Sequence, residues 1–302
     1  MDSLLYIFIL ICIVIIAIFF SSSWGYRQSL KKLSGNAIQR LLKIGGIEYN
    51  VKDIFVKINK PDKPNESLSK QNPSEDLESS GSIIFISGLG NGHEWWNWDE
   101  MLLTKKGQKV RDELKITNQT GLQNSIKDYT TMSFDMPGVG NSTLNDIKML
   151  ELSIQDLAKM IHDLAKYHKL PTPYTLVAHS AGALITYAYK ELYPVKKIIL
   201  IDPSPDFIIK DSGKIQQFLD KYKESKEFKH LVSATYMKLY NKAKYVIPDD
   251  AIVHYNIDKT KSDWKQFEEY QTQTFKHTIR HEGKSHWIHI NDPQAIIESI
   301  KS

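Results

Sequence analysis

Cysteine is nearly missing from this chain: its one cysteine, Cys12, lies inside an apolar run. An internal disulfide is therefore impossible, and cysteine usage gives no information on the redox compartment. A glycine-rich phosphate loop is also missing, and the net charge is only +4 because lysines are interleaved with acidic residues. These absences exclude a disulfide-rich scaffold and predict no nucleic-acid partner.

The composition that remains is that of a globular protein: 302 residues, 41% of them hydrophobic and 25% charged. This length allows one large α/β domain or two small ones, with enough apolar residues for a core in either case.

Charge is absent from residues 4–20, LLYIFILICIVIIAIFF. A helix of this length is roughly 25 Å long, close to the minimum for crossing a bilayer. We therefore expect an uncleaved single-pass transmembrane anchor that localises the protein to a membrane. Two alternatives are a signal peptide cleaved near the serines at 21–23, which would make the protein secreted, and a buried core helix.

The side of the membrane that the main domain faces stays open. Cations between residues 27 and 40 follow the apolar run and none precedes it, which favours a cytoplasmic C-terminal domain. Glycosylation triplets at Asn65, Asn118 and Asn141 favour the opposite orientation.

Two regions are expected after the apolar run, and the second contains a loop and an insertion. Residues 21–46 form a connector, and residues 47–302 form the main domain. Within that domain, residues 59–81 contain three prolines and no aromatic residue, which predicts a polar surface loop. Residues from about 205 to 250 are lysine-rich and helix-prone, and they predict an insertion over the core.

Apolar runs typical of buried strands alternate with helix-like segments from residue 81 onward. Between two such runs, Ser153 and Asp156 form a capping box at the start of a predicted amphipathic helix that extends to residue 170. Strands separated by helices predict a parallel sheet covered on both faces. The strand candidates are residues 82–88, 130–136, 174–180, 196–202 and 251–258, followed by a return strand at 276–283 and a C-terminal helix at 291–302.

Residues 178–182, Ala-His-Ser-Ala-Gly, stand where an apolar strand pattern turns directly into an apolar helix pattern. A serine at such a corner, with small residues two before and two after it, is typical of a nucleophile elbow, usually written G-x-S-x-G. The small residues matter because the strand and helix backbones nearly touch at this turn. The alternative interpretation of Ser180 is an ordinary serine at the start of a helix.

Four segments resemble motifs of the α/β-hydrolase fold family, in the family's order and over residues 47 to the end. One segment is the elbow itself. FISGLGNGHEWWNW resembles the family's oxyanion loop, with Ser87 in place of the usual histidine, and GKSHWIHINDP resembles its C-terminal G-x-H-W loop, with His286 as the histidine. SFDMPGVGNS is similar to the family's D-x-P-G-x-G-x-S segment, matched at Asp135, Pro137, Gly138, Gly140 and Ser142.

This resemblance implies an α/β-hydrolase fold: a mostly parallel central sheet flanked by helices, with residues 205–250 as a helical cap. It also implies a triad in which Ser180 is the nucleophile and His286 the base. The backbone N–H groups of Leu89 and Ala181 would form the oxyanion hole.

More than one residue could be the acid of the triad. Asp258 is the expected acid, because it stands at the end of the strand candidate at 251–258, where a loop opens, and precedes His286 by enough chain for one helix and a strand. Asp202 is its rival, because some hydrolases place the acid after the sixth strand. The neighbouring acids Asp249, Asp250 and Asp263 stay open as well.

The expected function is a membrane-anchored serine hydrolase that cleaves a carboxylic ester through an acyl-enzyme. The anchor favours a lipid or acylglycerol as the substrate. Family members that open epoxides or remove halogens carry a carboxylate at the elbow, so a serine disfavours those reactions. A peptidase, a thioesterase or an acyltransferase would use the same triad, and a non-catalytic receptor would lack one of its residues.

Trp95 and Trp96 follow the predicted oxyanion loop and are expected to line the substrate cleft, with burial beneath the cap as the alternative. His286 and His289 are three residues apart but have no further ligands at metal-binding spacing, so we expect no metal and no cofactor. The sequence does not indicate an oligomeric state.

Overall fold

The computed structural model divides the chain into two compact units, Met1–Arg40 and Leu41–Ser302. The residues that it describes belong to the second unit. The predicted anchor at 4–20 lies outside the described residues, as do most of the connector at 21–46 and most of the loop at 59–81. The described residues are 41–44, 47–50, 54–61, 81–103, 105–114, 116–117, 120–142, 152–205, 208, 213, 216–217, 220, 228–282 and 285–302.

Of the helices within these ranges, none combines the length and the apolar character needed to cross a membrane.

A seven-stranded sheet forms the centre of the second unit. Each strand predicted from the apolar runs is confirmed, and all neighbours pair in parallel except β3, which is antiparallel to β5. The order across the sheet is β3 (Val56–Asn59), β5 (Thr130–Phe134), β4 (Ser82–Ile86), β6 (Tyr174–His179), β7 (Lys197–Ile201), β8 (Ile252–Ile257) and β9 (His277–Glu282).

A separate two-stranded antiparallel sheet precedes it, formed by β1 (Leu41–Ile44) and β2 (Ile47–Asn50). Strand β1 falls within residues 21–46, which the sequence predicts as a connector. Because β1 pairs with β2 along its whole length, the compact unit begins at Leu41 rather than at Ile47.

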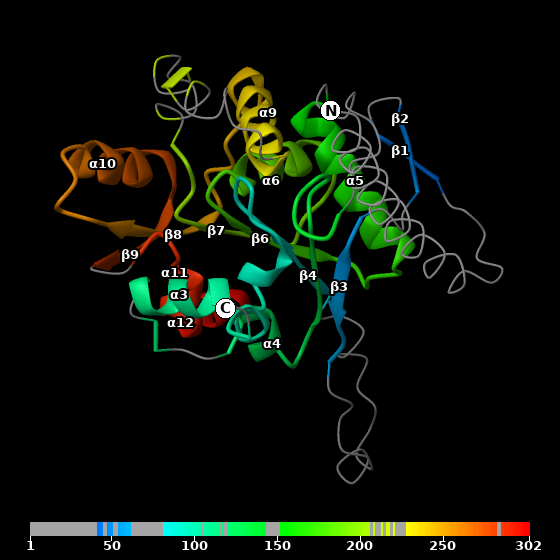
Figure 1. Ribbon diagram of the computed structural model, residues 1–302, viewed down its shortest axis with the longest axis horizontal. Coiled ribbons are helices and arrows are strands. Elements are labelled where there is room, and N and C mark those ends of the chain that lie inside the picture. The colour runs from blue at the N-terminus through cyan, green and yellow to red at the C-terminus, as the bar shows by residue number, and fades with distance from the viewer. Residues whose placement is uncertain are drawn as a thin grey trace, which may run out of the picture. The chain divides into compact units, whose positions relative to one another are not determined.

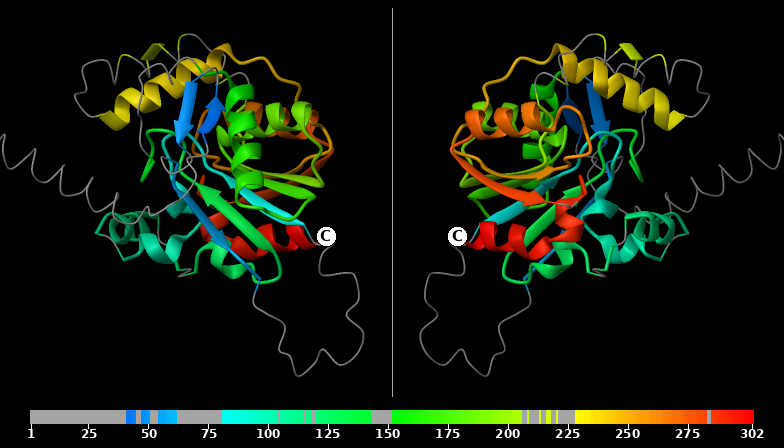
Figure 2. Two further views of the ribbon diagram at one scale, coloured as in Figure 1. Left: turned by 90° about the vertical axis from the view of Figure 1, so that its right-hand side faces the viewer. Right: turned by 90° about the vertical axis from the view of Figure 1, so that its left-hand side faces the viewer.

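Helices cover both faces of the seven-stranded sheet (Figures 1 and 2). Successive side chains of a strand point to opposite faces, so Ile84 and Ile86 of β4 belong to one core while Ile83 and Phe85 belong to the other. The first core is closed by α5 (Ile154–Tyr167) and α6 (Gly182–Leu192). The second is closed by α4 (Leu122–Ser125), α11 (Ile288–Asn291) and α12 (Pro293–Lys301).

The start of α5 confirms the predicted capping box. The Ser153 hydroxyl accepts a hydrogen bond from the Asp156 backbone N–H at 3.1 Å, and the Asp156 carboxylate accepts one from the Ser153 backbone N–H at 3.0 Å. These bonds satisfy backbone donors that the first turn of a helix leaves without partners.

The insertion predicted at 205–250 contains one long helix within the described residues, α9 (Phe228–Lys242). Val232, Tyr236 and Tyr240 of α9 are buried in the core that α5 and α6 close. The Tyr236 hydroxyl donates a hydrogen bond to the carbonyl of Pro137 at 3.0 Å, which ties α9 to the loop after β5. In Figure 1, α9 lies on the same side of the sheet as α5 and α6.

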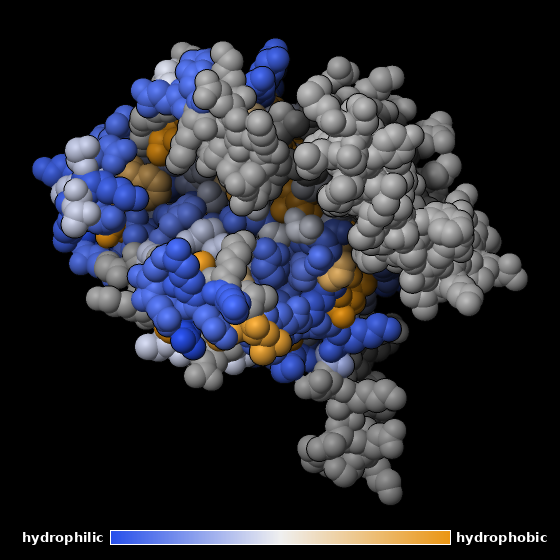
Figure 3. All heavy atoms as spheres, in the orientation of Figure 1, coloured by the Kyte–Doolittle hydropathy of each residue, from blue (hydrophilic) through white to orange (hydrophobic). Residues whose placement is uncertain are grey.

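The face of the molecule drawn in Figure 3 is mostly hydrophilic where the structure describes it, and hydrophobic residues there form small separate groups. Four more helices have bounds that the structure describes. They are η3 (His93–Trp95), α2 (Trp98–Met101), α3 (Lys105–Leu114) and α10 (Trp264–Thr274).

Candidate active site

Ser180 occupies a sharp turn between β6, which ends at His179, and α6, which begins at Gly182. Its φ angle is +54°, in the left-handed region that side chains other than glycine rarely adopt. The turn is held by a hydrogen bond from the Ser180 backbone N–H to the carbonyl of Ile201, at the end of β7, at 2.9 Å. Strained backbone of this kind is typical of functional positions.

Two glycines allow the backbone around Ser180 to come close to the loop after β4. A Cβ on Gly182 would lie 2.7 Å from the carbonyl oxygens of Ile86 and Ser87, and a Cβ on Gly88 would lie 3.0 Å from the Cβ of Ser180. The elbow and the predicted oxyanion loop are therefore in close contact, which makes glycine a steric requirement at position 182 and leaves little room for a larger residue at position 88.

His286 lies against Asp202. The His286 Nδ1 is 2.5 Å from the Asp202 Oδ2, and the other carboxylate oxygen, Oδ1, accepts a hydrogen bond from the Asn256 backbone N–H at 3.0 Å. Asp202 directly follows β7, is 8% exposed, and has a φ of +46°. A nearly buried carboxylate with both oxygens engaged is a suitable partner for a ring N–H of histidine.

The prediction that Asp258 pairs with His286 is wrong in this structure. Asp258 accepts hydrogen bonds from the hydroxyl of Thr260 at 2.6 Å and from its backbone N–H at 3.1 Å. These bonds, the hydroxyl first, lower the pKa of the Asp258 carboxyl below its usual range. The carboxylate is thus satisfied within its own turn, two residues along the chain.

Two of the other acids left open by the sequence pair with lysines. Asp249 forms an ion pair with Lys276, and Asp250 forms one with Lys190, each with 2.6 Å between nitrogen and oxygen.

The Ser180 hydroxyl has a neighbour that the sequence did not suggest. Its Oγ lies 3.3 Å from the Oγ of Ser204, and the Ser204 backbone N–H donates to the Ser180 carbonyl at 3.4 Å. Within the described ranges, no hydrogen bond joins Ser180 Oγ to His286; in unliganded enzymes such contacts are often long and tighten when substrate binds. The signal that could have identified Ser204 is its position between Pro203 and Pro205, which restricts the backbone beside Asp202.

Two backbone N–H groups, one directly after Ser180 and one directly after Gly88, have no hydrogen-bond acceptor among the residues that the structure describes. They belong to Leu89 and Ala181, the positions that the sequence predicts for an oxyanion hole. Ala181 immediately precedes α6, whose N-terminal end carries positive potential. An anion beside the Ser180 hydroxyl would therefore lie near the N-terminal end of α6 and the backbone N–H of Ala181.

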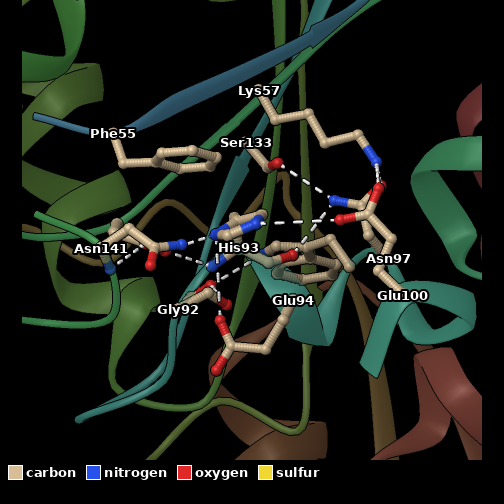
Figure 4. A network of polar contacts seen from close by, with 12 residues as sticks. Phe55, Lys57, Gly92, His93, Glu94, Asn97, Glu100, Ser133 and Asn141 are labelled. Carbon is tan, nitrogen blue, oxygen red and sulfur yellow. Dashed lines mark hydrogen bonds and ion pairs between the residues drawn. The ribbon is translucent and has the colours of Figure 1, made fainter. Parts of the chain in front are cut away.

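A buried polar network braces the loop that carries Leu89 (Figure 4). The fully buried Asp135 accepts hydrogen bonds from the His93 backbone N–H at 2.6 Å and from the Asn141 backbone N–H at 2.7 Å, and its Oδ1 lies 2.8 Å from the His93 Nδ1. A Cβ on Gly92 or on Gly140 would lie within 2.6 Å of this carboxylate. Glycine is therefore required on both sides of Asp135.

Ser142 completes the same arrangement. Its hydroxyl donates to the Asp135 carbonyl at 2.7 Å and accepts from the Phe55 backbone N–H at 2.9 Å, which joins the loop after β5 to the residue before β3. The Asp135 and Ser142 positions of the D-x-P-G-x-G-x-S segment thus hold two loops together.

Trp95 and Trp96 do not line the cleft as predicted. Trp96 is fully buried, packs on Phe85, and donates its indole N–H to the Ser87 hydroxyl at 2.8 Å. Trp95 is 8% exposed and stacks on Trp287, with ring centroids 3.9 Å apart. Both rings have apolar partners in the interior, so the alternative interpretation, burial, is the one that the structure supports.

His93, Glu94 and Asp135 offer ligand atoms within 4.8 Å of one another, close enough to hold a metal ion. The Asp135 oxygens already accept the hydrogen bonds of His93 and Asn141, and the His93 Nδ1 already faces Asp135. Hydrogen bonding accounts for this cluster, and we assign no metal to it.

A cavity of about 420 Å³ opens beside Asp202 and His286. Its volume is in the range of small-molecule sites. Its lining is mixed: Asp258, Lys261 and Asp263 are among its polar residues, and the apolar ones are Pro203, Pro205, Ile208, Ile257, Trp264 and Phe267.

Comparisons with known proteins agree with the fold. Residues 83–222 match the Alpha/beta hydrolase family, a range that includes the loop after β4, the elbow and Asp202. No curated protein is a significant match.

Solved structures resemble the chain over most of its length at low identity. The Cif epoxide hydrolase from Acinetobacter nosocomialis has a TM-score of 0.56 and 13% identity, covering 93% of this chain and 95% of that one. A hydrolase from Oleispira antarctica has a TM-score of 0.53 and 15% identity, covering 82% and 94%. A lipase-esterase related protein from Clostridium acetobutylicum has a TM-score of 0.50 and 15% identity, covering 82% and 98%. At these identities the similarity shows the fold alone.

The steric requirement at Gly182 can be tested by unfolding. Helix propensity favours alanine over glycine by about 1 kcal/mol, so an unconstrained Gly182→Ala would be neutral or stabilising. We expect the opposite sign, a loss of roughly 1–3 kcal/mol in the free energy of unfolding, because the added Cβ would overlap two carbonyl oxygens. Urea denaturation checks this, with the exposed Gln294→Ala of α12 as the control. An unchanged or higher stability of Gly182→Ala would contradict the close approach.

Proposed function

Because the chain belongs to the alpha/beta-hydrolase family, we propose that it is a serine hydrolase that cleaves a carboxylic ester with Ser180, His286 and Asp202. One observation carries this proposal: the carboxylate of Asp202 contacts His286 at 2.5 Å, next to a serine held on a strained elbow. A nucleophile, a base and a group that orients the base are the three parts that such chemistry needs.

In this mechanism the Ser180 hydroxyl attacks the ester carbonyl and His286 takes its proton. Asp202 accepts the Nδ1–H of His286, so Nε2 is the ring nitrogen that is free to act as the base. Asp202 also stabilises the imidazolium that forms. His286 then gives the proton to the leaving alcohol. Water next attacks the acyl carbonyl while His286 takes its proton, and His286 returns a proton to the Ser180 oxygen as the carboxylic acid leaves.

The negative charge on the tetrahedral intermediate needs fixed donors. The backbone N–H groups of Leu89 and Ala181 are the proposed pair, because each is without an acceptor in the described part of the chain, Ala181 follows Ser180, and Leu89 follows Gly88, which lies against Ser180. Donors that are already in place require no reorganisation when the charge develops, and this gives them a large effect on the rate.

The cavity beside His286 supports an ester with an apolar group of limited size. Its walls include Trp264 and Phe267 of α10 and Pro203 and Pro205 of the segment that follows Asp202. Burial of each methylene there would add about 0.8 kcal/mol to binding. A lipid or acylglycerol is one class of substrate with such a group.

We do not propose epoxide hydrolysis for this chain, although its fold is similar to that of an epoxide hydrolase. At 13% identity the similarity concerns the fold alone. The residue at the elbow of this chain is a serine, whereas family members that open epoxides use a carboxylate there.

Covalent labelling tests the proposal most simply. A fluorophosphonate probe should label the wild-type protein, and Ser180→Ala should lose both the label and about a millionfold of the esterase turnover. Ser204→Ala is the matched control, since it removes the hydroxyl 3.3 Å away and keeps the nucleophile. The esters tested should include acylglycerols and aryl esters, next to acyl thioesters and aminoacyl amides. A folded wild-type protein that takes no label and cleaves none of these would refute the proposal.

The assignment of the acid has its own test. Asp202→Asn should lower kcat by about ten-thousandfold, because the amide would hold His286 in the wrong tautomer. Asp258→Asn, which changes a carboxylate hydrogen-bonded to Thr260, should keep kcat close to the wild-type value. If Asp258→Asn were the inactive variant and Asp202→Asn the active one, the acid assignment would be reversed while the hydrolase class would stand.

A membrane anchor at residues 4–20 is the second part of the proposal, and it depends on the sequence alone. A charged residue at the centre of a spanning helix costs about 2.5–3.5 kcal/mol. Ile11→Asp combined with Ile15→Asp should therefore move the protein out of the membrane fraction, whereas Ser21→Asp at the end of the run should not. Equal fractionation of both variants with the wild type would remove the support for the anchor.

A further inference from the structure

His179, the residue before Ser180, connects the nucleophile to the base. It ends β6, and its Nε2–H donates a hydrogen bond to the backbone carbonyl of His286 at 3.0 Å. The rings of His179 and His286 have their centroids 4.5 Å apart. A single side chain thus joins the strand that carries Ser180 to the loop that carries His286.

The surroundings of His179 keep it as a neutral donor. Its side chain is 1% exposed and contacts the rings of Trp287 and His289, with centroids 4.6 and 4.8 Å away. Burial, and then the proximity of His286 and His289, holds the pKa of His179 well below its usual range. A neutral imidazole that donates through Nε2 has no proton on Nδ1, so its tautomer is fixed by this one bond.

The neighbours of His286 on its loop are restrained as well, because Trp287 stacks on Trp95 and the Ser285 hydroxyl accepts a hydrogen bond from the Asn291 side-chain amide at 2.7 Å. The His286 side chain is 43% exposed, so packing holds it only on one side. Asp202 fixes its Nδ1, and the Ser285 hydroxyl accepts from the Trp287 backbone N–H at 3.1 Å. The bond from His179 ties the backbone carbonyl of His286 directly to the end of β6.

We propose that His179 is a positioning residue, whose hydrogen bond to the His286 carbonyl sets the distance between the ring of the base and the hydroxyl of Ser180. This inference rests on the proposed hydrolase function. His179 touches neither the substrate nor the moving proton. It acts through His286, and an error of about 1 Å in such a placement can cost 100-fold in rate.

The test compares two substitutions of nearly equal length and volume. In His179→Gln an amide N–H can replace the Nε2–H donor, whereas His179→Met removes it. We expect His179→Met to lose about 10- to 100-fold in kcat with little change in KM, and His179→Gln to keep most of the wild-type kcat. The rate at which a fluorophosphonate probe labels Ser180 should fall in the same order.

The melting temperature separates positioning from a structural role. If His179 only supported the fold, both variants would lose stability, and the folded fraction of each would label Ser180 at the wild-type rate. That result would overturn the inference. It would also be overturned if His179→Gln were as slow as His179→Met, because the hydrogen bond would then not be the property that matters.

A measurement on the wild-type protein covers the case in which the variants do not fold. The ¹⁵N chemical shifts of His179 should show a neutral ring protonated at Nε2 throughout pH 5–8. A ring that titrates in this range would contradict the proposed donor. Failure of the hydrolase proposal is distinguishable from all of these outcomes, since the wild-type protein itself would then neither take the probe nor cleave an ester.

Discussion

The close approach of three strand ends is the constraint on which the site depends. The loop after β4 touches the turn after β6 through Gly88 and Gly182, and the turn after β6 is bonded to the end of β7 through Ser180 and Ile201. Adjacent parallel strands end at the same edge of a sheet, so the residues that follow them meet. Ser180, Asp202 and the loop after β4 are neighbours because their strands are neighbours.

This proximity is accompanied by backbone strain at Ser180 and Asp202, the residues proposed as the nucleophile and the acid. Ser180 and Asp202 both have positive φ angles, which cost free energy for side chains other than glycine. Surrounding bonds compensate for part of it: the Asp202 backbone N–H donates to the carbonyl of His254 at 2.6 Å, and its carboxylate accepts from Asn256. A well-packed scaffold is therefore used to hold a local geometry that isolated turns would not adopt.

The buried network around Asp135 holds the loop after β4 in place, as the surrounding bonds hold Ser180 and Asp202. Asn97 donates to Gln123 at 2.7 Å and lies next to Ser133, while Lys57 of β3 bonds to Asn97 and Glu100 (Figure 4). Buried polar groups that are all satisfied rigidify the segments that they join. The segment that follows Leu89 is thus held at His93 and Asn97 by a network that contains neither Ser180 nor His286.

The strands, the capping box and the elbow could be predicted from the sequence because each depends on a local pattern. The acid could not be chosen, because Asp202 and Asp258 both follow strands and only the position of the His286 loop decides between them. Burial of Trp96 depends likewise on a distant partner, Phe85, and on the Ser87 hydroxyl. Ser204 was missed for a similar reason, since its contact with Ser180 joins two loops that no motif connects.

The central claim is that Ser180 reacts within a geometry set by Asp202, His286 and the backbone donors. A crystal structure of the protein after reaction with a fluorophosphonate addresses it most directly. The account predicts a phosphonyl group on Ser180 Oγ, one phosphonyl oxygen within hydrogen-bond distance of the N–H groups of Leu89 and Ala181, and His286 still paired with Asp202. A phosphonyl group on another residue, or a His286 ring paired with Asp258, would contradict it.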